Sequence, residues 1–204
     1  MFDTSVLDRA IAFAVKAHAG IARRGKRIPY IVHPLEALAI TATMTDNQEL
    51  LAATVLHDVV EDTAFTLADI EREFGRRVAE LVAGESETPV PGVPESESWH
   101  QRRQATLDRI RKQSREAKMV ALGDKLSNMR AISRDYDKLG DALWGRFHVT
   151  DPAEHAWHYR GLADSLSELA DTEAYQEFAR LVDRVFPKDK FPPLVAGRRP
   201  EAQA

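Results

Sequence analysis

Apolar residues recur three and four positions apart along most of the 204-residue chain, with polar residues between them. This spacing places apolar side chains on one face of an α-helix. No segment alternates regularly enough to predict a strand, and no internal repeat is visible. The segments with helical spacing are 6–19, 34–44, 48–62, 67–74, 76–83, 99–113, 116–133, 137–147, 153–169 and 172–186. We therefore predict an all-α fold, a helical bundle in a single domain.

Capping residues mark where several of these helices begin and end. Asp46 or Asn47 precedes the most apolar helix and can cap its first backbone N–H groups. Thr66 and Asp69 have the spacing of a capping box, and Gly75 follows where that short helix should end. Two independent patterns thus predict the same helix boundaries.

Two segments lack helical spacing. Residues 85–98 contain three prolines, a glycine and several acidic residues, which predicts a surface loop. Residues 187–204 contain further prolines, and we expect a loosely ordered C-terminal tail there. The folded domain is therefore expected to cover residues 1–186.

The composition limits the cellular compartments and the kinds of partner that we expect. The formal net charge is −4, which gives no bulk electrostatic reason to expect nucleic acid or an anionic membrane as a partner. Cysteine is absent, which excludes disulfides and thiolate ligands and fits a reducing compartment. Asp3 and Asp8 stand where a signal peptide carries basic residues, and no uncharged stretch is long enough to span a bilayer. We expect a soluble cytoplasmic protein.

The candidate chemistry begins at the end of the most apolar helix. His57, Asp58, Glu61 and Asp62 follow the apolar run 50–56. On one continuous helix, His57 would share a face with Glu61, and Asp58 with Asp62. Burying unpaired carboxylates is costly, and a divalent cation bound by imidazole and carboxylate would remove that cost. The alternative is a helix end that reaches the surface, where the acidic side chains are solvated.

Two more residues extend this candidate metal site. His33 lies between apolar residues at a helix entrance, where a lone histidine is usually structural. Asp124 interrupts an apolar helical face and has Lys125 beside it as an alternative partner. With His57 and Asp58 they form a set of two histidines and two carboxylates, drawn from three helices that a compact bundle can bring together.

Five stretches resemble a known family in the same order along the chain. The matching segments are 14–18, 29–34, 52–63 with its His-Asp-x-x-Glu-Asp core, 74–75 and 123–130. At these positions the sequence resembles the HD-domain phosphohydrolases. More narrowly, it is similar to the hydrolase domains of the RelA/SpoT homologues, particularly the stand-alone small alarmone hydrolases.

This resemblance implies an activity, a cofactor and a set of site residues. It implies hydrolysis of the 3′-pyrophosphate of guanosine tetra- and pentaphosphate, which gives pyrophosphate and GDP or GTP. It implies one Mn²⁺ ion held by His33, His57, Asp58 and Asp124, and it assigns Glu61 and Asp62 to the attacking water. The choice of Mn²⁺ over Fe²⁺, Co²⁺ or Zn²⁺ rests on the resemblance, because such a ligand set suits several of these metals.

A basic loop precedes His33 and supplies candidate contacts for phosphate. We expect Arg23, Arg24 and Lys26 to bind the substrate, with a solvated basic turn as the alternative. Asn128 is expected to hydrogen-bond the nucleotide or to support the metal ligands. Lys125 is a weaker candidate.

The same loop keeps other functions open, because it is one residue longer than in related hydrolases. Alternative substrates are an adenosine 3′-pyrophosphate, the 2′-phosphate of NADPH or a nucleoside monophosphate. An alternative of another class is a catalytically silent nucleotide-binding protein. The expected partner is in each case a small nucleotide, and the oligomeric state is left open.

The histidines and tryptophans of the last third of the chain invite a second site. His148, His155 and His158 have no acidic partner at metal-site spacing. We therefore expect them to be packing or surface residues, and Trp144 and Trp157 to be core residues rather than a platform for a base. The C-terminal helices are expected to be a packing layer.

Overall fold

The computed structural model describes residues 3–23, 26–87 and 90–192. Most of these residues are helical, and no β-strand is present among them. An isolated antiparallel bridge joins Ala22 and Pro29 at the two ends of the basic loop. The predicted all-α class is confirmed.

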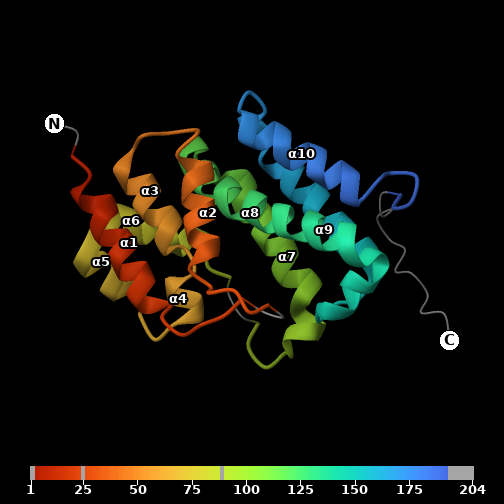
Figure 1. Ribbon diagram of the computed structural model, residues 1–204, viewed down its shortest axis with the longest axis horizontal. Helices are drawn as coiled ribbons and strands as arrows, with labels where there is room; N and C mark the ends of the chain where they lie inside the picture. Colours follow the sequence, from red (N-terminus) through yellow and green to blue (C-terminus); the bar gives the residue numbers. More distant parts are fainter. Residues whose placement is uncertain (1–2, 24–25, 88–89, 193–204) are drawn as a thin grey trace.

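Figure 1 shows the order and placement of the helices. In chain order they are α1 (Ser5–Ala17), α2 (Val32–Thr41), α3 (Gln48–Leu56), α4 (Val59–Asp62), α5 (Leu67–Phe74), α6 (Arg76–Glu85), α7 (Glu95–Lys112), α8 (Arg115–Leu139), the 3₁₀ helix η1 (Gly140–Arg146), α9 (Pro152–Ser165), the 3₁₀ helix η2 (Ser167–Leu169) and α10 (Glu173–Val185). Within these residues, no helix combines the length and the apolar character that a membrane span requires.

Two apolar cores lie on either side of α8. The first joins α1, α3, α5 and α6 and is centred on α3, in which every residue from Leu50 to Leu56 is buried. The second joins α7, α9, α10 and η1. Helix α8 contributes Val120 to the first core and Leu122 and Leu126 to the second. Because α8 is shared, it fixes the position of one core relative to the other (Figure 1).

The predicted caps form as expected. Asn47 accepts hydrogen bonds from the backbone N–H groups of Glu49 and Leu50 at the start of α3. Thr66 and Asp69 form a reciprocal capping box at the start of α5, and Gly75 ends that helix with φ +87°. These local signals are sufficient because each cap is completed within one helical turn.

Three predicted boundaries are wrong. The predicted 137–147 helix is not a separate α-helix, because α8 continues to Leu139, ends where Gly140 takes φ +55°, and is followed by the 3₁₀ helix η1. The loop predicted for 85–98 is shorter, since α7 begins at Glu95. The predicted helix through residue 62 is interrupted, because α3 ends at Leu56 and α4 begins at Val59.

The C-terminal boundary stays a prediction. Phe191 is buried in the second core, and Arg160 donates hydrogen bonds to the backbone carbonyls of Phe186 and Phe191. Residues 193–204, which make up most of the predicted tail, lie outside the described residues.

Candidate active site

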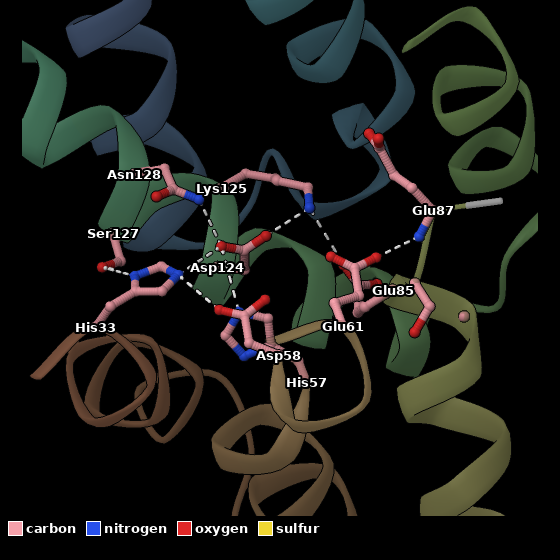
Figure 2. A network of polar contacts seen from close by, with 12 residues as sticks. His33, His57, Asp58, Glu61, Glu85, Glu87, Asp124, Lys125, Ser127 and Asn128 are labelled. Carbon is pink, nitrogen blue, oxygen red and sulfur yellow. Dashed lines mark hydrogen bonds and ion pairs between the residues drawn. The ribbon is translucent and has the colours of Figure 1, made fainter. Parts of the chain in front are cut away.

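Four side chains from α2, the α3–α4 turn and α8 converge on one point (Figure 2). They form the histidine–aspartate cluster, which consists of His33, His57, Asp58 and Asp124. His33 Nε2 lies 3.0 Å from Asp124 Oδ1 and 3.5 Å from Asp58 Oδ2. His57 Nε2 lies 3.0 Å from Asp58 Oδ2 and 3.5 Å from Asp124 Oδ1. The structure thus brings together all four residues that the sequence suggested as metal ligands.

The break between α3 and α4 explains how two consecutive residues reach the same point. Successive side chains on a continuous helix point about 100° apart. His57 and Asp58 lie in the turn between the two helices, and their side-chain atoms approach to 3.0 Å. The interruption that the sequence did not predict is therefore part of the geometry of the cluster.

A backbone carbonyl sets the tautomer of His57. Its Nδ1 lies 2.7 Å from the carbonyl oxygen of Thr54, which can only accept a hydrogen bond. Nδ1 therefore carries the proton, and Nε2 of the neutral ring offers a lone pair to the cluster.

A two-step relay sets the tautomer of His33 in the same way. The Ser127 hydroxyl donates to Glu36 Oε2 at 2.8 Å, so its oxygen is free to accept from His33 Nδ1, also at 2.8 Å. His33 Nε2 then also faces the cluster with a lone pair. Both rings are thus held in the orientation and the tautomer that a metal ligand needs.

The electrostatics of the cluster call for a cation. Among the described residues, His57 Nε2 is buried and makes no hydrogen bond. Burial lowers the pKa of His57, but Asp58 and Asp124 outweigh this effect and raise it well above its ordinary value. Burial also works against ionisation of Asp58, yet the neighbouring His57 lowers the pKa of this carboxyl to about 2. A divalent cation would supply the positive charge that a proton on His57 otherwise supplies, so the donor set fits a metal ion.

Neighbouring polar groups hold the two carboxylates in place. The Tyr30 hydroxyl donates to Asp58 Oδ2 at 2.7 Å. The Asn128 amide donates to Asp124 Oδ1 at 2.6 Å and accepts from Arg23 Nη2 at 2.8 Å. Asn128 therefore supports a cluster carboxylate directly, and Arg23 reaches the site through Asn128.

The residues of the basic loop that were predicted to contact phosphate have different partners in the structure. Arg23 donates a hydrogen bond to Asn128, whereas Lys26 forms an ion pair with Asp135 at 2.7 Å. Arg24 lies outside the described residues. Neither Arg23 nor Lys26 lines the cavity beside the cluster, so their contact with a substrate stays a prediction.

Glu61 and Asp62 lie on α4 in different surroundings. Glu61 lines the cavity and accepts a hydrogen bond from the backbone N–H of Glu87 (Figure 2). Its carboxylate loses enough water there to raise its pKa, an effect that the Glu87 hydrogen bond opposes. Both residues are exposed, but Asp62 does not line the cavity, and its backbone N–H donates to the Asp58 carbonyl at 2.9 Å. Glu61 is thus better placed to meet a group inside the cavity.

The cavity has a volume of about 420 Å³ and lies where the two cores meet. Besides the cluster, its lining includes groups from α6 and the segment after it, from α7 and from α9 that the sequence did not single out as site residues. These are Glu85, Glu87, Arg102, Arg103 and Tyr159. Paired arginines in the sequence were the available signal, but nothing in the sequence indicates which face of α7 meets α8.

The C-terminal histidines belong to this lining as well as to the packing. His155 and His158 are buried and line the cavity, so the surface alternative does not apply to them. Burial lowers the pKa of His155, and burial with the charge of Arg103 lowers that of His158 well below its ordinary value. Both rings are therefore neutral near pH 7. Trp144 is a buried core residue, as predicted.

Lys125 and Glu85 connect the cluster to the rest of the cavity. Lys125 Nζ forms ion pairs with Asp124 Oδ2 and, at 3.4 Å, with Glu85 Oε2. Burial works against the charge on Lys125, but Asp124 and Glu85 raise its pKa above the ordinary value. Asp124 thus contacts Lys125 as well as the cluster, so the two interpretations of this residue are compatible.

Curated proteins similar to this chain include (p)ppGpp hydrolases and GTP pyrophosphokinases. The bifunctional (p)ppGpp synthase/hydrolase SpoT of Escherichia coli K12 is 31% identical over 186 residues, which cover 88% of this chain and 26% of the relative. A guanosine-3′,5′-bis(diphosphate) 3′-pyrophosphohydrolase of Vibrio cholerae is 29% identical over 186 residues, covering 88% of this chain and 25% of the relative. The chain therefore spans about a quarter of the length of these relatives.

Solved structures give the same fold. The crystal structure of lmo0812 from Listeria monocytogenes has a TM-score of 0.65 and 31% identity, covering 76% of this chain and 98% of that one. A metazoan ortholog of SpoT, described as hydrolysing ppGpp, has a TM-score of 0.70 and 21% identity, covering 90% and 97%. At that identity the second likeness shows the fold alone. The HD domain profile matches residues 10–145, more than half of the sequence, and the chain belongs to the HD domain family.

Proposed function

We propose that this chain is a metal-dependent hydrolase that removes the 3′-pyrophosphate from (p)ppGpp-like nucleotides. The products are pyrophosphate and GDP or GTP. The observation that carries this proposal is the convergence of the histidine–aspartate cluster beside Glu61 in one cavity. The 31% identity to SpoT over most of the chain supports the choice of substrate. The absence of cysteine agrees with a reducing compartment, and we propose that the protein acts in the cytoplasm.

The cluster would hold one divalent cation, which we propose to be Mn²⁺. When bound, this ion would lower the pKa of water and offset the negative charge of the phosphates. Thr54, Ser127 and Tyr30 would keep the ligands in position, because each donates to or accepts from a cluster side chain.

Glu61 would orient the attacking water and accept its proton. The water oxygen bonds to the phosphorus attached to the ribose, the bond from that phosphorus to the 3′ oxygen breaks, and the 3′ oxygen takes up a proton. Pyrophosphate leaves with the water oxygen, so atoms and charges balance. Asp62 is proposed to assist from its position on α4 next to Glu61.

The remaining polar groups would bind the nucleotide, a small-molecule partner. Asn128 and Arg23 already contact each other at the edge of the cluster, where both can meet a phosphate or the ribose. Arg24 and Lys26 are proposed as further phosphate contacts from the same basic loop.

A nucleotide panel tests the proposal against its rivals. The Mn²⁺-loaded protein is assayed side by side with ppGpp, an adenosine 3′-pyrophosphate, NADPH and a deoxynucleoside monophosphate, with products identified by mass. We expect ppGpp to be turned over fastest, giving GDP and pyrophosphate. Faster turnover of another nucleotide, or orthophosphate as the only phosphate product, would contradict the proposal.

A second assay separates an enzyme from a silent nucleotide-binding protein. Glu61→Gln removes the proton acceptor and keeps the size of the side chain, so kcat should fall by about 10²- to 10⁴-fold. Metal content should stay at the wild-type level. Unchanged turnover in this variant would contradict the role of Glu61.

A further inference from the structure

Two adjacent arginines on α7, Arg102 and Arg103, form the arginine pair. Both line the same cavity as the histidine–aspartate cluster. Their side chains are 14% and 32% exposed, so each guanidinium has lost much of its contact with water. A partly buried guanidinium needs an anion close by.

One carboxylate serves both members of the arginine pair. Glu87 Oε2 lies 2.6 Å from Arg102 Nη1, and Glu87 Oε1 accepts from Arg103 Nη1. The two guanidinium groups therefore share the Glu87 carboxylate. In addition, Arg103 Nε is buried and has no hydrogen-bond partner in the described part of the chain. A terminal phosphate, with up to two charges and three acceptor oxygens, matches two guanidinium groups better than one carboxylate does.

The other cations near the cavity either contact the histidine–aspartate cluster or lie outside the cavity lining. Lys26 is paired with Asp135, and Lys125 contacts both Asp124 and Glu85. Arg23 does not line the cavity and donates to Asn128, which does. Of the described lysines and arginines, only Lys125 and the arginine pair line the cavity. The arginine pair is therefore the cationic group that can meet the end of a pyrophosphate whose other end lies at the histidine–aspartate cluster.

The exchange of Glu87 for a phosphate needs no rearrangement of the backbone. The Glu87 N–H is held by Glu61, and the carbonyls of Glu85 and Ser86 accept hydrogen bonds from Arg109. Only the Glu87 side chain has to turn away. Glu61 can then keep its backbone partner while the arginine pair changes its anion.

We propose that Arg102 and Arg103 bind the terminal phosphate of the substrate's pyrophosphate group, and that the Glu87 carboxylate occupies this place until the phosphate arrives. The inference rests on the proposed function for its substrate and adds the residues that recognise the leaving group.

Direct binding of inorganic pyrophosphate to the Mn²⁺-loaded protein, measured by calorimetry, tests the inference without any turnover. Arg103→Gln and Arg102→Gln should each weaken binding by about 10- to 100-fold, as expected for loss of a charged hydrogen bond. Glu87→Gln should strengthen binding, because a competing charge is removed. Arg103→Lys, which keeps the charge, should fall between wild type and Arg103→Gln.

Arg109→Gln is the matched control. Arg109 lies on the same helix and holds the same 85–87 segment, but it does not line the cavity. Its replacement should change pyrophosphate binding by less than about threefold. Equal weakening by Arg109→Gln and Arg103→Gln would overturn the inference, since the arginines would then act by anchoring the segment. Weaker binding in Glu87→Gln would overturn it as well.

Kinetics separate this inference from the proposed function. The arginine variants should raise KM for ppGpp more than they lower kcat, because the terminal phosphate is bound before and during the reaction. Hydrolysis of ppGpp with an unchanged KM in both arginine variants would refute the arginine site and leave the proposed function standing. Pyrophosphate binding in the expected pattern without any ppGpp turnover would refute the proposed function instead.

Discussion

The two sides of the cavity differ in how firmly their polar groups are held. In the histidine–aspartate cluster, both rings are fixed by a second hydrogen bond and both carboxylates have a neutral donor. The two members of the arginine pair share the Glu87 carboxylate, and Arg103 Nε makes no hydrogen bond within the described residues. The first arrangement suits a ligand that stays bound, and the second suits a ligand that enters and leaves.

The backbone segments that carry these groups differ in the same way: those of the cluster are more deeply buried than the segment that contacts the arginine pair. The cluster rests on α3, which is buried from Leu50 to Leu56, and on the central part of α8. The arginine pair contacts the 85–87 segment, which joins α6 to the loop before α7. The following predictions break or sharpen this contrast, from the largest expected effect to the smallest.

Asp124→Ala should have the largest effect, because it removes a carboxylate from the cluster and leaves Lys125 with one partner fewer. We expect kcat to fall by about 10³-fold or more, together with loss of bound metal. Metal content by mass spectrometry and the rate with ppGpp measure this. Asp135→Ala, which removes the carboxylate paired with Lys26 and Arg146 but touches no cluster residue, is the control and should retain its metal. Full metal content in Asp124→Ala would disprove its role as a ligand.

Ser127→Ala should weaken metal binding without abolishing it. The variant breaks the relay from Glu36 to His33 but leaves all four cluster residues in place. An expected loss of about 10- to 100-fold in metal affinity follows from freeing the His33 ring. Arg103→Gln should leave metal affinity unchanged in the same titration. Equal losses in the two variants would remove the distinction between the two sides.

Two helix glycines, Gly123 and Gly161, allow the helix packing on each side of the cavity to be disturbed by the single methyl group of an alanine. A Cβ on Gly123 would lie 2.9 Å from the Ala37 carbonyl and would collide with Thr41, both on α2. A Cβ on Gly161 would meet only the side chain of Leu107 on α7. Helix propensity favours alanine by about 1 kcal/mol at both sites. A backbone carbonyl cannot move as a leucine side chain can. At Gly123 the steric cost should therefore exceed the gain in helix propensity, whereas at Gly161 it should not.

Thermal and denaturant unfolding compare the two glycine variants. Gly123→Ala should lower the free energy of unfolding by about 1–3 kcal/mol, and Gly161→Ala should be near neutral. The reverse order would mean that α2 and α8 can separate more easily than α7 and α9.

The smallest effect is expected from Glu85, which lies between the two sides. Burial raises the pKa of Glu85 above its ordinary value of 4.5, although Lys125 opposes this. Below pH 4.5 the carboxyl is protonated in the folded and the unfolded chain. As the pH rises through the raised folded pKa, the folded state must accommodate a buried charge and loses stability. Glu85→Gln carries no such charge, so its Tm relative to wild type should increase between pH 4 and pH 7. A difference in Tm that is constant with pH would contradict this.

Local patterns predicted the fold class and the cluster. Helical spacing gave the all-α class, and the caps at Asn47 and Thr66 were read from single turns. The four cluster residues were proposed because histidines and carboxylates interrupted apolar helix faces, where an unpaired charge is costly. The resemblance to HD-domain hydrolases then grouped them into one site.

Long-range geometry could not be predicted in the same way. The turn at His57 and Asp58 interrupts a segment whose apolar residues have helical spacing on both sides, and it forms where the two side chains face the cluster. Arg102 and Arg103 look like ordinary surface charges in the sequence. Their place in the cavity depends on how α7 packs beside α8 and α9, which no local pattern reports. The charges close to His33 in sequence were favoured instead, and Lys26 turned out to pair with Asp135.

The central claim is that a water activated beside the histidine–aspartate cluster releases an intact pyrophosphate from the 3′ position. Turnover of ppGpp by the Mn²⁺-loaded protein in ¹⁸O-labelled water, with the products resolved by mass, tests it most directly. The account predicts one ¹⁸O atom in pyrophosphate and none in GDP. Label in orthophosphate, or label in the nucleotide product, would contradict it.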